Sequence, residues 1–347
     1  MSECLFISIV IPCRNEEAYI DQCLASILAN DYPKDEVEVL VVDGMSEDGT
    51  RAVVARYARR YRSVHLVDNP KRVIPVALNI GIKRAIGEVI MRMDAHATYD
   101  QKYISKCVNA LEKHGAESVG GIWRIIPRTN TLIGRAITKS LSHRFGIGNA
   151  HYRLRKSQEP KWVDTVPFFC HRKEVFQKVG FFNEKVERSE DMEFNLRLKK
   201  AGGRTILVPD IVSCYYARSD IKSFLQHNWS NGVWAILPYA YSTVMPVFWR
   251  HLVPLVFVTS LLGFLVLTLV VPFGVYMVTG IAVAYAIVNL AASMQVAIKE
   301  KEIRYIVLMP LIFGMLHFGY GLGSLWGVIK VVRISQFWDK LFCLQWR

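Results

Sequence analysis

Near its start the chain reads Ser8-Ile9-Val10-Ile11-Pro12-Cys13-Arg14-Asn15-Glu16, a short β-rich run that ends in a proline and a polar loop. A second β-rich run, Val37 to Val42, ends at Asp43, and a further one, Glu88 to Met93, ends at Asp94. Between these runs, apolar residues recur at helical spacing. Repeated strand, helix, strand units predict an α/β fold with a mostly parallel sheet, whose ligands bind outside the carboxyl ends of the strands.

Alternation of the two patterns covers the first 100 residues, and one helix is clear further along. Expected strands are Phe6 to Ile11, Val37 to Val42, Val64 to Val67 and Glu88 to Met93. Helical faces are expected at Ile20 to Leu28, Val53 to Tyr61, Val73 to Ile86 and Glu190 to Ala201, the last closed by Gly202-Gly203.

The C-terminal part of the 347-residue chain is strongly apolar. Leu252 to Ile298 is a run of 47 residues without a charged side chain, and Tyr305 to Ile329 is another of 25. Because a membrane-spanning helix needs roughly 20 apolar residues, the first run predicts two such helices with a break at Pro272 and Gly274, and the second predicts one more. The opening run Leu5 to Pro12 is too short for a secretory signal and is interpreted as a strand.

The segment before the first apolar run mixes aromatic side chains with Lys222, His227 and Asn231. This mixture is typical of a membrane interface, although an ordinary amphipathic core helix is an open alternative. The sequence therefore predicts an α/β domain over residues 1–219, an interfacial segment over 220–250, and a membrane domain with about three transmembrane helices over 251–347.

Charge and cysteine content narrow the class of protein. Residues 1–250 carry 36 basic and 27 acidic side chains, an excess that suits an anionic membrane surface and a phosphate-bearing ligand. No basic helix or aromatic-basic module indicates a nucleic-acid partner. Seven scattered cysteines without a C-x-x-C pair disfavour a disulfide framework and a structural zinc site, and fit a reducing cytosolic face.

Acidic residues close two of the predicted strands, so Asp43 and Asp94 are expected at the same edge of the sheet. Asp43 opens a turn-rich Asp-Gly loop, which by itself is a weak signal. Asp94-Ala95-His96 is a stronger signal, because a carboxylate and an imidazole two residues apart can both face a divalent cation that bridges a diphosphate.

The triplet Ser189-Glu190-Asp191 begins a helix, with Ser189 as the expected cap. Its acidic residues fit either helix capping or a general base, and the residues alone leave both interpretations open.

Taken in order, these motifs resemble the family 2 glycosyltransferases of GT-A fold over about residues 6 to 218. The motifs are Ser8 to Glu16, Val41-Val42-Asp43-Gly44-Met45-Ser46-Glu47-Asp48-Gly49-Thr50, Arg92-Met93-Asp94-Ala95-His96-Ala97 and Ser189-Glu190-Asp191. A closer resemblance is to the membrane-bound glucosyltransferases of succinoglycan-type exopolysaccharide assembly. It is carried by Arg92 to Ala97, Asn69-Pro70-Lys71-Arg72, Ala77-Leu78-Asn79-Ile80-Gly81 and Arg250-His251-Leu252-Val253-Pro254.

The resemblance implies a nucleotide-sugar donor, expected to be a UDP-hexose, a divalent cation (Mn²⁺ preferred, or Mg²⁺) and inversion at the anomeric carbon. It implies Asp191 as the base that deprotonates the acceptor hydroxyl. Asp94 and His96 occupy the positions of the metal-binding D-x-D motif. The residues that the resemblance implies for binding the donor are Pro12, Arg14, Glu16, Asp43 and Asp94. Asp43 is expected to accept a hydrogen bond from the uracil ring of the nucleotide.

Two departures from the family pattern concern the site. His96 replaces the second carboxylate, which lowers the negative charge at the metal and offers a nitrogen ligand. Processive members carry Q-x-x-R-W, whereas here Gln226 and Trp229 occur without the arginine. The expected function is therefore transfer of one sugar to a polyprenyl-linked acceptor in exopolysaccharide or cell-envelope glycan assembly, at the inner membrane with the catalytic domain in the cytoplasm. Alternatives are a processive polysaccharide synthase and a polyprenyl-phosphate glycosyltransferase.

Two other classes fit the sequence poorly. A transporter needs polar or charged intramembrane positions, and the apolar runs offer only Asn289, Gln295 and His317. A nicotinamide oxidoreductase is disfavoured because no G-x-G-x-x-G follows the first strand. With the catalytic domain inside, three crossings place Lys330 and Arg333 on the outer face, against the positive-inside tendency, and Lys299, Lys301 and Arg304 inside, as expected. Either the tendency is broken or one segment does not cross, with the glycine-rich Gly314 to Gly327 stretch as a re-entrant alternative.

Overall fold

The structure, a computed structural model, describes residues 4–154, 158–242, 249–334 and 337–338. The chain divides into two compact units, each described by itself below. The first unit contains residues 1–124 and 151–216, and the second contains residues 125–150 and 217–347. Residues 125–150 therefore group with the C-terminal part of the chain, whereas the sequence placed them in the catalytic domain.

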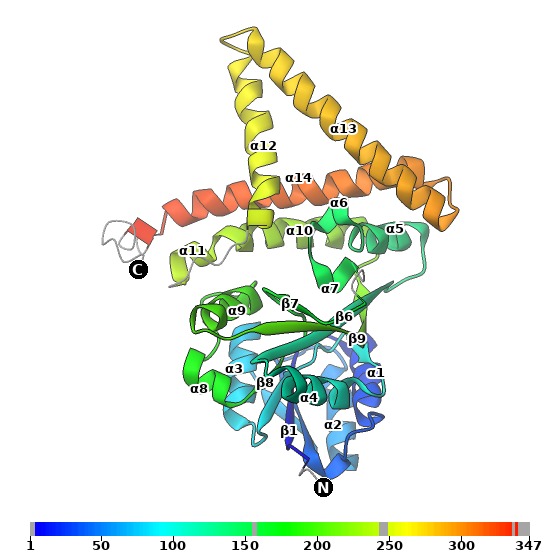
Figure 1. The fold of residues 1–347 in the computed structure, drawn as a ribbon, viewed down its shortest axis with the longest axis vertical. Helices are drawn as coiled ribbons and strands as arrows, with labels where there is room; N and C mark the ends of the chain where they lie inside the picture. Colours follow the sequence, from blue (N-terminus) through cyan, green and yellow to red (C-terminus); the bar gives the residue numbers. More distant parts are fainter. Residues whose placement is uncertain (1–3, 155–157, 243–248, 335–336, 339–347) are drawn as a thin grey trace. The chain divides into compact units, whose positions relative to one another are not determined.

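The first four strands of the first unit, in the blue to cyan part of the ribbon in Figure 1, form a sheet in the order β3-β2-β1-β4. Their pairing is parallel, as the strand patterns predicted. Each of the three connections contains a helix, as parallel pairing requires. The strands are β1 (Ile7–Cys13), β2 (Val37–Asp43), β3 (Val64–Asp68) and β4 (Val89–Arg92), and the connecting helices are α1 (Glu17–Leu28), α2 (Thr50–Arg60) and α3 (Ile74–Arg84), with a short 3₁₀ helix η1 (Lys34–Glu36) before β2.

The second half of the sheet is antiparallel, so the sheet as a whole is mixed. β8 pairs with β4, β6 with β8, and β5 and β7 with β9, all in antiparallel register. This half was not resolved by the sequence pattern, because its strands are short or unevenly spaced. They are β5 (Ala97–Tyr99), β6 (Ser118–Pro127), β7 (Lys161–Val163), β8 (Cys170–Arg172) and β9 (Thr205–Ala217); the remaining helices here are α4 (Tyr103–His114), α7 (His151–Leu154), α8 (Glu174–Val179) and α9 (Glu190–Lys200).

A cluster of phenylalanines forms the core where β8, α8 and α9 meet the parallel strands. Phe169, Phe176, Phe182 and Phe194 pack together with residues of β1, β2 and α3. His171 lies within this cluster, fully buried, with its ring 4.3 Å from that of Phe169. This apolar core fixes α9 against the sheet, and so it fixes the position of the acidic residues at the start of α9.

The second unit is helical, and three of its described helices are long and apolar enough to cross a membrane. These are α12 (Trp249–Leu267), α13 (Phe273–Glu300) and α14 (Tyr305–Val332). The predicted break at Pro272 is confirmed, since Pro272 is the residue before α13. The Gly314 to Gly327 stretch lies within the continuous helix α14, so a re-entrant break there is not observed. The other helices are α5 (Leu132–Ser140), α6 (Arg144–Ile147), α10 (Ile221–Ile236) and α11 (Pro238–Tyr241).

The predicted interfacial segment, residues 220–250, contains α10, α11 and the start of α12, while residues 243–248 lie outside the described part of the chain. Asp220 caps α10 by accepting a hydrogen bond from the backbone N–H of Ser223. Trp229 is 41% exposed. Trp234, Tyr239 and Tyr241 pack on a cluster that includes Val331 of α14. The side chain of Trp249 lies outside the described residues.

Candidate active site

The carboxyl ends of β1, β2 and β4 bring the sequence motifs to one edge of the parallel sheet. The chain after β1 stays paired with the chain after β2, because the backbone N–H of Gly44 donates to the carbonyl of Cys13 over 2.7 Å. Both loops then run outward together. The predicted placement of Asp43 and Asp94 at a common edge follows directly from the register of these strands.

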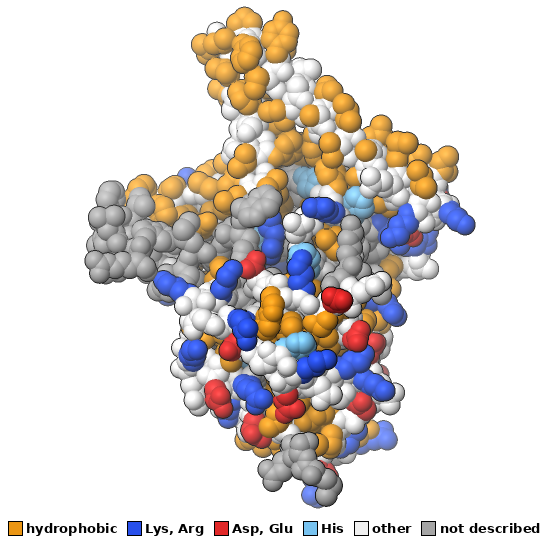
Figure 2. Space-filling view, in the orientation of Figure 1, with side chains coloured by type: hydrophobic (Ala, Val, Ile, Leu, Met, Phe, Trp, Pro, Cys, Tyr) orange, Lys and Arg blue, Asp and Glu red, His pale blue; other side chains and the backbone are white. Residues whose placement is uncertain are grey.

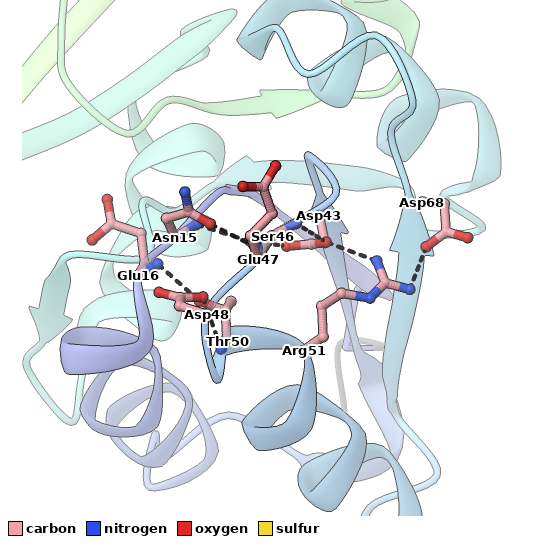
Figure 3. A network of polar contacts seen from close by, with 9 residues as sticks. All are labelled: Asn15, Glu16, Asp43, Ser46, Glu47, Asp48, Thr50, Arg51 and Asp68. Atoms are coloured by element: carbon pink, nitrogen blue, oxygen red, sulfur yellow. Dashed lines mark hydrogen bonds and ion pairs between the residues drawn. The ribbon is translucent and has the colours of Figure 1, made fainter.

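Asp43 is the centre of a polar network at this edge (Figure 3). Its carboxylate accepts hydrogen bonds from the backbone N–H of Ser46 over 2.9 Å and from the Ser46 hydroxyl over 2.5 Å. Arg51 adds an ion pair of 2.7 Å and reaches Asp68 with its other arm over 2.8 Å. Asp43 itself is fully buried. In this structure its carboxylate therefore organises the β2–α2 loop.

The loop after β1 is fastened to the same network. Asn15 adopts a φ of 53°, and its side chain accepts from the backbone N–H of Glu47. The backbone N–H of Glu16 donates to the hydroxyl of Thr50 over 2.8 Å. Arg14 is exposed and lies over Gly44, where an added Cβ would come within 3.3 Å of the arginine side chain. The two loops thus form one connected surface that presents Arg14 outward.

The triplet after β4 faces this surface. Asp94 Oδ1 accepts from Nε of Arg92 over 2.8 Å. His96 Nδ1 lies 3.0 Å from a carboxylate oxygen of Glu16, so residues from the first and third predicted motifs are in contact. Asp94 and His96 side chains are 16% and 23% exposed, respectively. Both motifs therefore remain partly open to a ligand.

A single buried arginine, Arg92, connects the triplet Asp94-Ala95-His96 to the start of α9. Arg92 Nη1 pairs with Glu190 over 2.9 Å while its Nε holds Asp94. Burial alone would lower the pKa of Arg92, but the surrounding carboxylates of Asp94, Glu190 and Asp191 raise it above its usual value. Arg92 therefore stays charged and fixes the spacing between the two acidic motifs.

The two acidic residues of α9 have different environments. Glu190 is 5% exposed, and burial raises its pKa to about 7 although Arg92 opposes the shift. Asp191 is half-buried, and its Oδ1 accepts from the backbone N–H of Met192. A pKa near neutrality suits a general base, but a base must first reach its substrate, and Asp191 is the less buried of the two carboxylates.

The predicted capping role of Ser189 is wrong. Ser189 adopts a left-handed conformation with φ of 61°, and within the described part of the chain its side chain makes no capping hydrogen bond to α9. A residue in this conformation turns the chain sharply into the helix. This turn, together with the ion pair to Arg92, sets the direction in which Glu190 and Asp191 point.

An aromatic and cationic group next to these motifs was not found by the sequence analysis. Tyr215 of β9 contacts His96 edge to face at 5.3 Å and stacks on Trp123 of β6 at 4.3 Å, with an angle of 3° between the rings. The guanidinium of Arg153 lies 5.1 Å from the Trp123 ring and 5.4 Å from that of Tyr152. Its buried Nε has no hydrogen-bond partner among the described residues.

Arg153 is also electrostatically coupled to the acidic end of α9. Burial would lower its pKa, but Tyr152, Tyr215 and Asp191 leave the pKa raised. The sequence signal for this residue was only its place at the start of the basic stretch Arg153 to Lys161. Trp123 and Tyr215 carry no spacing signal, because the two residues are more than 90 positions apart in the chain.

The residues present fit a divalent cation only together with a phosphate-bearing ligand. Among the described residues, no group of three or more His, Cys, Asp or Glu side chains gathers at one point. Asp94 and His96 supply at most two side-chain ligands, and each already has one protein partner that orients it. A metal site with only two side-chain ligands would be completed by phosphate oxygens and water, as is usual for Mg²⁺ and Mn²⁺ at nucleotide sites.

Two further motif residues have structural contacts. Asn79 exchanges hydrogen bonds with the backbone of Phe182 in both directions, at 2.9 Å each, and also donates to Glu184. Asn69 is buried and donates to the carbonyl of Val73 over 3.0 Å. These asparagines hold α3 and the segment before α9 in place.

Comparison with known proteins agrees with this geometry. Residues 8–180 match the family model for glycosyl transferase family 2. Over 333 residues the chain is 28% identical to dolichyl N-acetyl-α-D-glucosaminyl phosphate 3-β-D-2,3-diacetamido-2,3-dideoxy-β-D-glucuronosyltransferase of Methanococcus voltae, covering 94% of this chain and 98% of the relative. It is also 28% identical to the succinoglycan biosynthesis protein ExoA of Rhizobium meliloti, covering 68% of this chain and 75% of that protein.

Among solved structures, the mannosyltransferase PcManGT from Pyrobaculum calidifontis, in complex with GDP-Man and Mn²⁺, superimposes with a TM-score of 0.57 at 18% identity, covering 94% of this chain and 88% of that one. This likeness concerns the fold, which is the GT-A fold expected from the motifs. Family match, motif order and fold all agree: the chain contains a family 2 glycosyltransferase domain and is a glycosyltransferase.

Proposed function

We propose that the protein transfers one sugar from a UDP-hexose to a sugar hydroxyl of a polyprenyl-linked acceptor, with inversion, in exopolysaccharide or cell-envelope glycan assembly. Two relatives support the acceptor class: one is named for a dolichyl-phosphate-linked sugar and the other for succinoglycan biosynthesis. Three apolar helices, which indicate membrane association, are in keeping with a lipid-linked acceptor.

The observation that carries the proposal is the double ion pair of Arg92. It holds the donor motif at Asp94 and the base motif at Glu190 to the same buried guanidinium, while Asp191 remains accessible. Direct displacement with inversion needs an attacking hydroxyl on one side of the anomeric carbon and a leaving diphosphate on the other. A fixed spacing between the two motifs satisfies this requirement, because it holds the reacting groups in line.

In this proposal Asp191 takes the proton from the acceptor hydroxyl as its oxygen attacks the anomeric carbon. The bond from that carbon to the diphosphate breaks, and the nucleoside diphosphate leaves with the electron pair. A divalent cation at Asp94 and His96, when bound, stabilises the charge on the diphosphate. Glu16 orients the His96 ring, and Pro12, Arg14 and the loop organised by Asp43 form the nucleoside side of the pocket.

The acceptor side is proposed to be the group formed by Trp123, Tyr152, Arg153 and Tyr215. Aromatic faces and a cation suit a ligand that presents both sugar rings and phosphate. The group contacts His96 through Tyr215 and is electrostatically coupled to Asp191 through Arg153, so it borders both the metal motif and the proposed general base. Arg153 is then available to pair with the phosphate of the lipid-linked acceptor.

The proposed location is the inner membrane, with residues 1–219 in the cytoplasm as the catalytic domain. Six described cysteines are free, which suits a reducing compartment. Residues 220–250 then form the interfacial segment, and residues 251–347 the membrane domain.

The test is product identification. Purified full-length protein is incubated with a panel of UDP-sugars and GDP-mannose, and with polyprenyl phosphate, polyprenyl-phosphate-linked sugars and polyprenyl-diphosphate-linked sugars, followed by mass spectrometry. We expect a single hexose added to a lipid-linked sugar. A ladder of products with many added sugars would instead establish a processive synthase, and transfer with none of the acceptors would contradict the proposed class.

A second candidate, transfer to polyprenyl phosphate itself, is favoured by the position of Arg153 near the base motif. The two functions differ in their need for a base, since an ionised phosphate needs no deprotonation. Asp191→Asn is expected to abolish transfer to a sugar hydroxyl. If the wild-type protein glycosylates polyprenyl phosphate and Asp191→Asn retains that activity, the second candidate is correct.

A further inference from the structure

Helix α14 satisfies the length and hydropathy test for a membrane span, yet it is paired along most of its length with α10 (Figure 1). Phe224, near the start of α10, shares a cluster with Phe313. In the middle, a Cβ added to Gly232 would come within 2.0 Å of the Tyr320 carbonyl oxygen. At the end, Val331 packs on the last turn of α10 and on α11. The two helices therefore lie side by side and run in the same direction.

Helix α10 is too polar to cross a bilayer beside α14. It contains Gln226, His227, Asn228 and Asn231, and it is not among the described helices that qualify as spans. Burying such side chains in hydrocarbon is costly, and several of them in one helix disfavour a span. Because α14 is packed against α10 from its middle to its end, the pair is expected to keep the same depth in the membrane.

Helices α12 and α13 leave this pair as a hairpin. Their hydrogen bonds and ring contacts with α14 begin near the middle of each helix and continue away from the hairpin tip. On α12, His251 bonds to the Tyr320 hydroxyl over 2.9 Å, and Val258 packs against Gly321. On α13, among the hydrogen bonds and ring contacts of the described residues, the one nearest to the hairpin tip is that of Tyr285, which bonds to His317 over 3.0 Å.

The outer arms of this hairpin are short compared with a bilayer. Beyond Val258, α12 continues for nine residues to Leu267, which is about 14 Å of helix. From Phe273 to Tyr285, α13 covers about 18 Å. The hydrocarbon core of a bilayer is about 30 Å thick, so arms of this length reach about half of it.

The tip of the hairpin has the properties of a segment that stays in hydrocarbon. Leu269 and Val270 are 83% and 80% exposed, and Figure 2 shows hydrophobic side chains over the visible face of this end. The backbone N–H groups of Thr268, Leu269, Val270 and Val271 all donate to carbonyls within the chain. A loop in water does not need such internal pairing, whereas a loop in lipid does.

The distribution of charge favours the same arrangement. Between residues 249 and 334, basic residues occur only at the inner ends of the hairpin and at the ends of α14: Arg250, Lys299, Lys301, Arg304, Lys330 and Arg333. If the hairpin returns to the membrane face from which it enters, and α14 lies in the plane of the membrane, all six basic residues lie on that same face. The positive-inside tendency, which three crossings violate, is then satisfied.

We propose that α12 and α13 form a hairpin that enters the bilayer from the cytoplasmic face and turns back inside it, while α10 and α14 lie together in the headgroup layer. The chain is then held in a single leaflet by its described residues and crosses the membrane nowhere among them. This arrangement goes beyond the glycosyl transfer reaction, and it replaces the three crossings expected from the length of the apolar runs.

The test uses full-length protein in proteoliposomes, with Cys4, Cys214 and Cys343 replaced by serine and a spin label at one introduced cysteine. Accessibility to oxygen and to a water-soluble nickel complex then reports depth independently of orientation. For Val270→Cys we expect high oxygen and low nickel accessibility. Lys301→Cys, at the inner end of α13, is the control and is expected to be accessible to nickel. High nickel accessibility at Val270, as at a water-exposed outer loop, overturns the hairpin.

A second series decides the orientation of α14. Labels at Val307, Leu311, Leu322 and Val332, all exposed apolar positions, are expected to give one common shallow depth. A profile that is deepest in the middle and shallow at both ends would show that α14 crosses the bilayer. Both series require no substrate, so their outcome is independent of the sugar and acceptor that the enzyme uses.

Discussion

At the scale of single residues, burial separates two neighbouring carboxylates that the sequence treats as equivalent. Glu190 lies under the protein surface and is ion-paired with Arg92, whereas Asp191 is half-buried and is attracted to Arg92 and Arg153 at longer range. Glu190, whose pKa burial raises to about 7, thus has a structural role through its pairing with Arg92. Accessibility, which only the fold supplies, decides the assignment of the base.

Asp191→Asn is expected to lower the rate of transfer by at least about 10² to 10⁴, because the amide cannot accept the acceptor's proton. The affinity for UDP, measured by calorimetry, should change little, since the donor contacts come from other motifs. Glu190→Gln is the matched comparison: it should retain more transfer than Asp191→Asn while reducing thermal stability through the weakened pairing with Arg92. If Glu190→Gln loses transfer and Asp191→Asn keeps it, the base is Glu190.

His171 gives a prediction for pH. Burial among phenylalanines lowers its pKa to about 4, whereas a histidine in the unfolded chain titrates near 6.5. The unfolded state therefore binds a proton first as the pH falls, and stability contributed by neutral His171 is complete above about pH 6.5 and lost towards pH 4. The corresponding free energy is roughly 3 kcal/mol.

The measurement is the melting temperature in detergent between pH 7.5 and pH 4. His171→Phe is the control, because phenylalanine packs in the same cluster and does not titrate. We expect the wild-type protein to lose more stability over this range than the variant. Parallel curves for the two proteins would contradict a neutral, buried His171.

At the scale of elements, glycines decide how closely the helices of the second unit approach. Gly232 faces the backbone of α14, and Gly327 and Gly323 face the backbone of α10. In membrane proteins, small residues at helix contacts allow such backbone approach. Gly323 and Gly327 of α14 are therefore explained by close packing against α10, and not by a break in the helix.

Gly232→Val is expected to lower the melting temperature of the second unit strongly, because the new Cβ alone would come within 2.0 Å of the Tyr320 carbonyl oxygen, which is backbone and cannot rotate away. Overpacking of a well-packed contact typically costs about 1 to 3 kcal/mol, and a backbone clash should exceed this. Gly314→Val on α14 is the control, since no atom outside its own helix lies within 4 Å of the added Cβ. Equal losses in both variants would contradict the close pairing of α10 and α14.

At the scale of the whole molecule, the binding of the cation is expected to depend on the binding of the nucleotide-sugar donor. Within the described part of the chain, at most two side-chain ligands are available at Asp94 and His96, so the cation site is expected to be complete only with the diphosphate. Binding of cation and nucleotide should therefore be coupled, each tightening the other by the same factor.

Mn²⁺ affinity, measured by calorimetry or by the electron paramagnetic resonance of free Mn²⁺, is expected to rise at least tenfold when UDP is present. Asp94→Ala should remove this enhancement, whereas Glu112→Ala, which changes an exposed acidic residue of α4, should leave it intact.

In activity assays we expect no transfer in excess chelator and faster transfer with Mn²⁺ than with Mg²⁺, because imidazole is a better ligand for manganese. Equal rates with both metals would remove His96 from the set of direct ligands.

The sequence by itself determined the parallel half of the sheet, the place of Asp43 and Asp94 at its edge, and the apolar helices. These features follow from local patterns, since alternation of strand and helix fixes parallel pairing, and parallel pairing brings strand ends together. Only the tertiary structure decided the antiparallel half, the link from Arg92 to both acidic motifs, the group around Arg153 and the pairing of α14 with α10. Each of these depends on contacts between residues far apart in the chain, and such contacts leave no periodic pattern in the sequence.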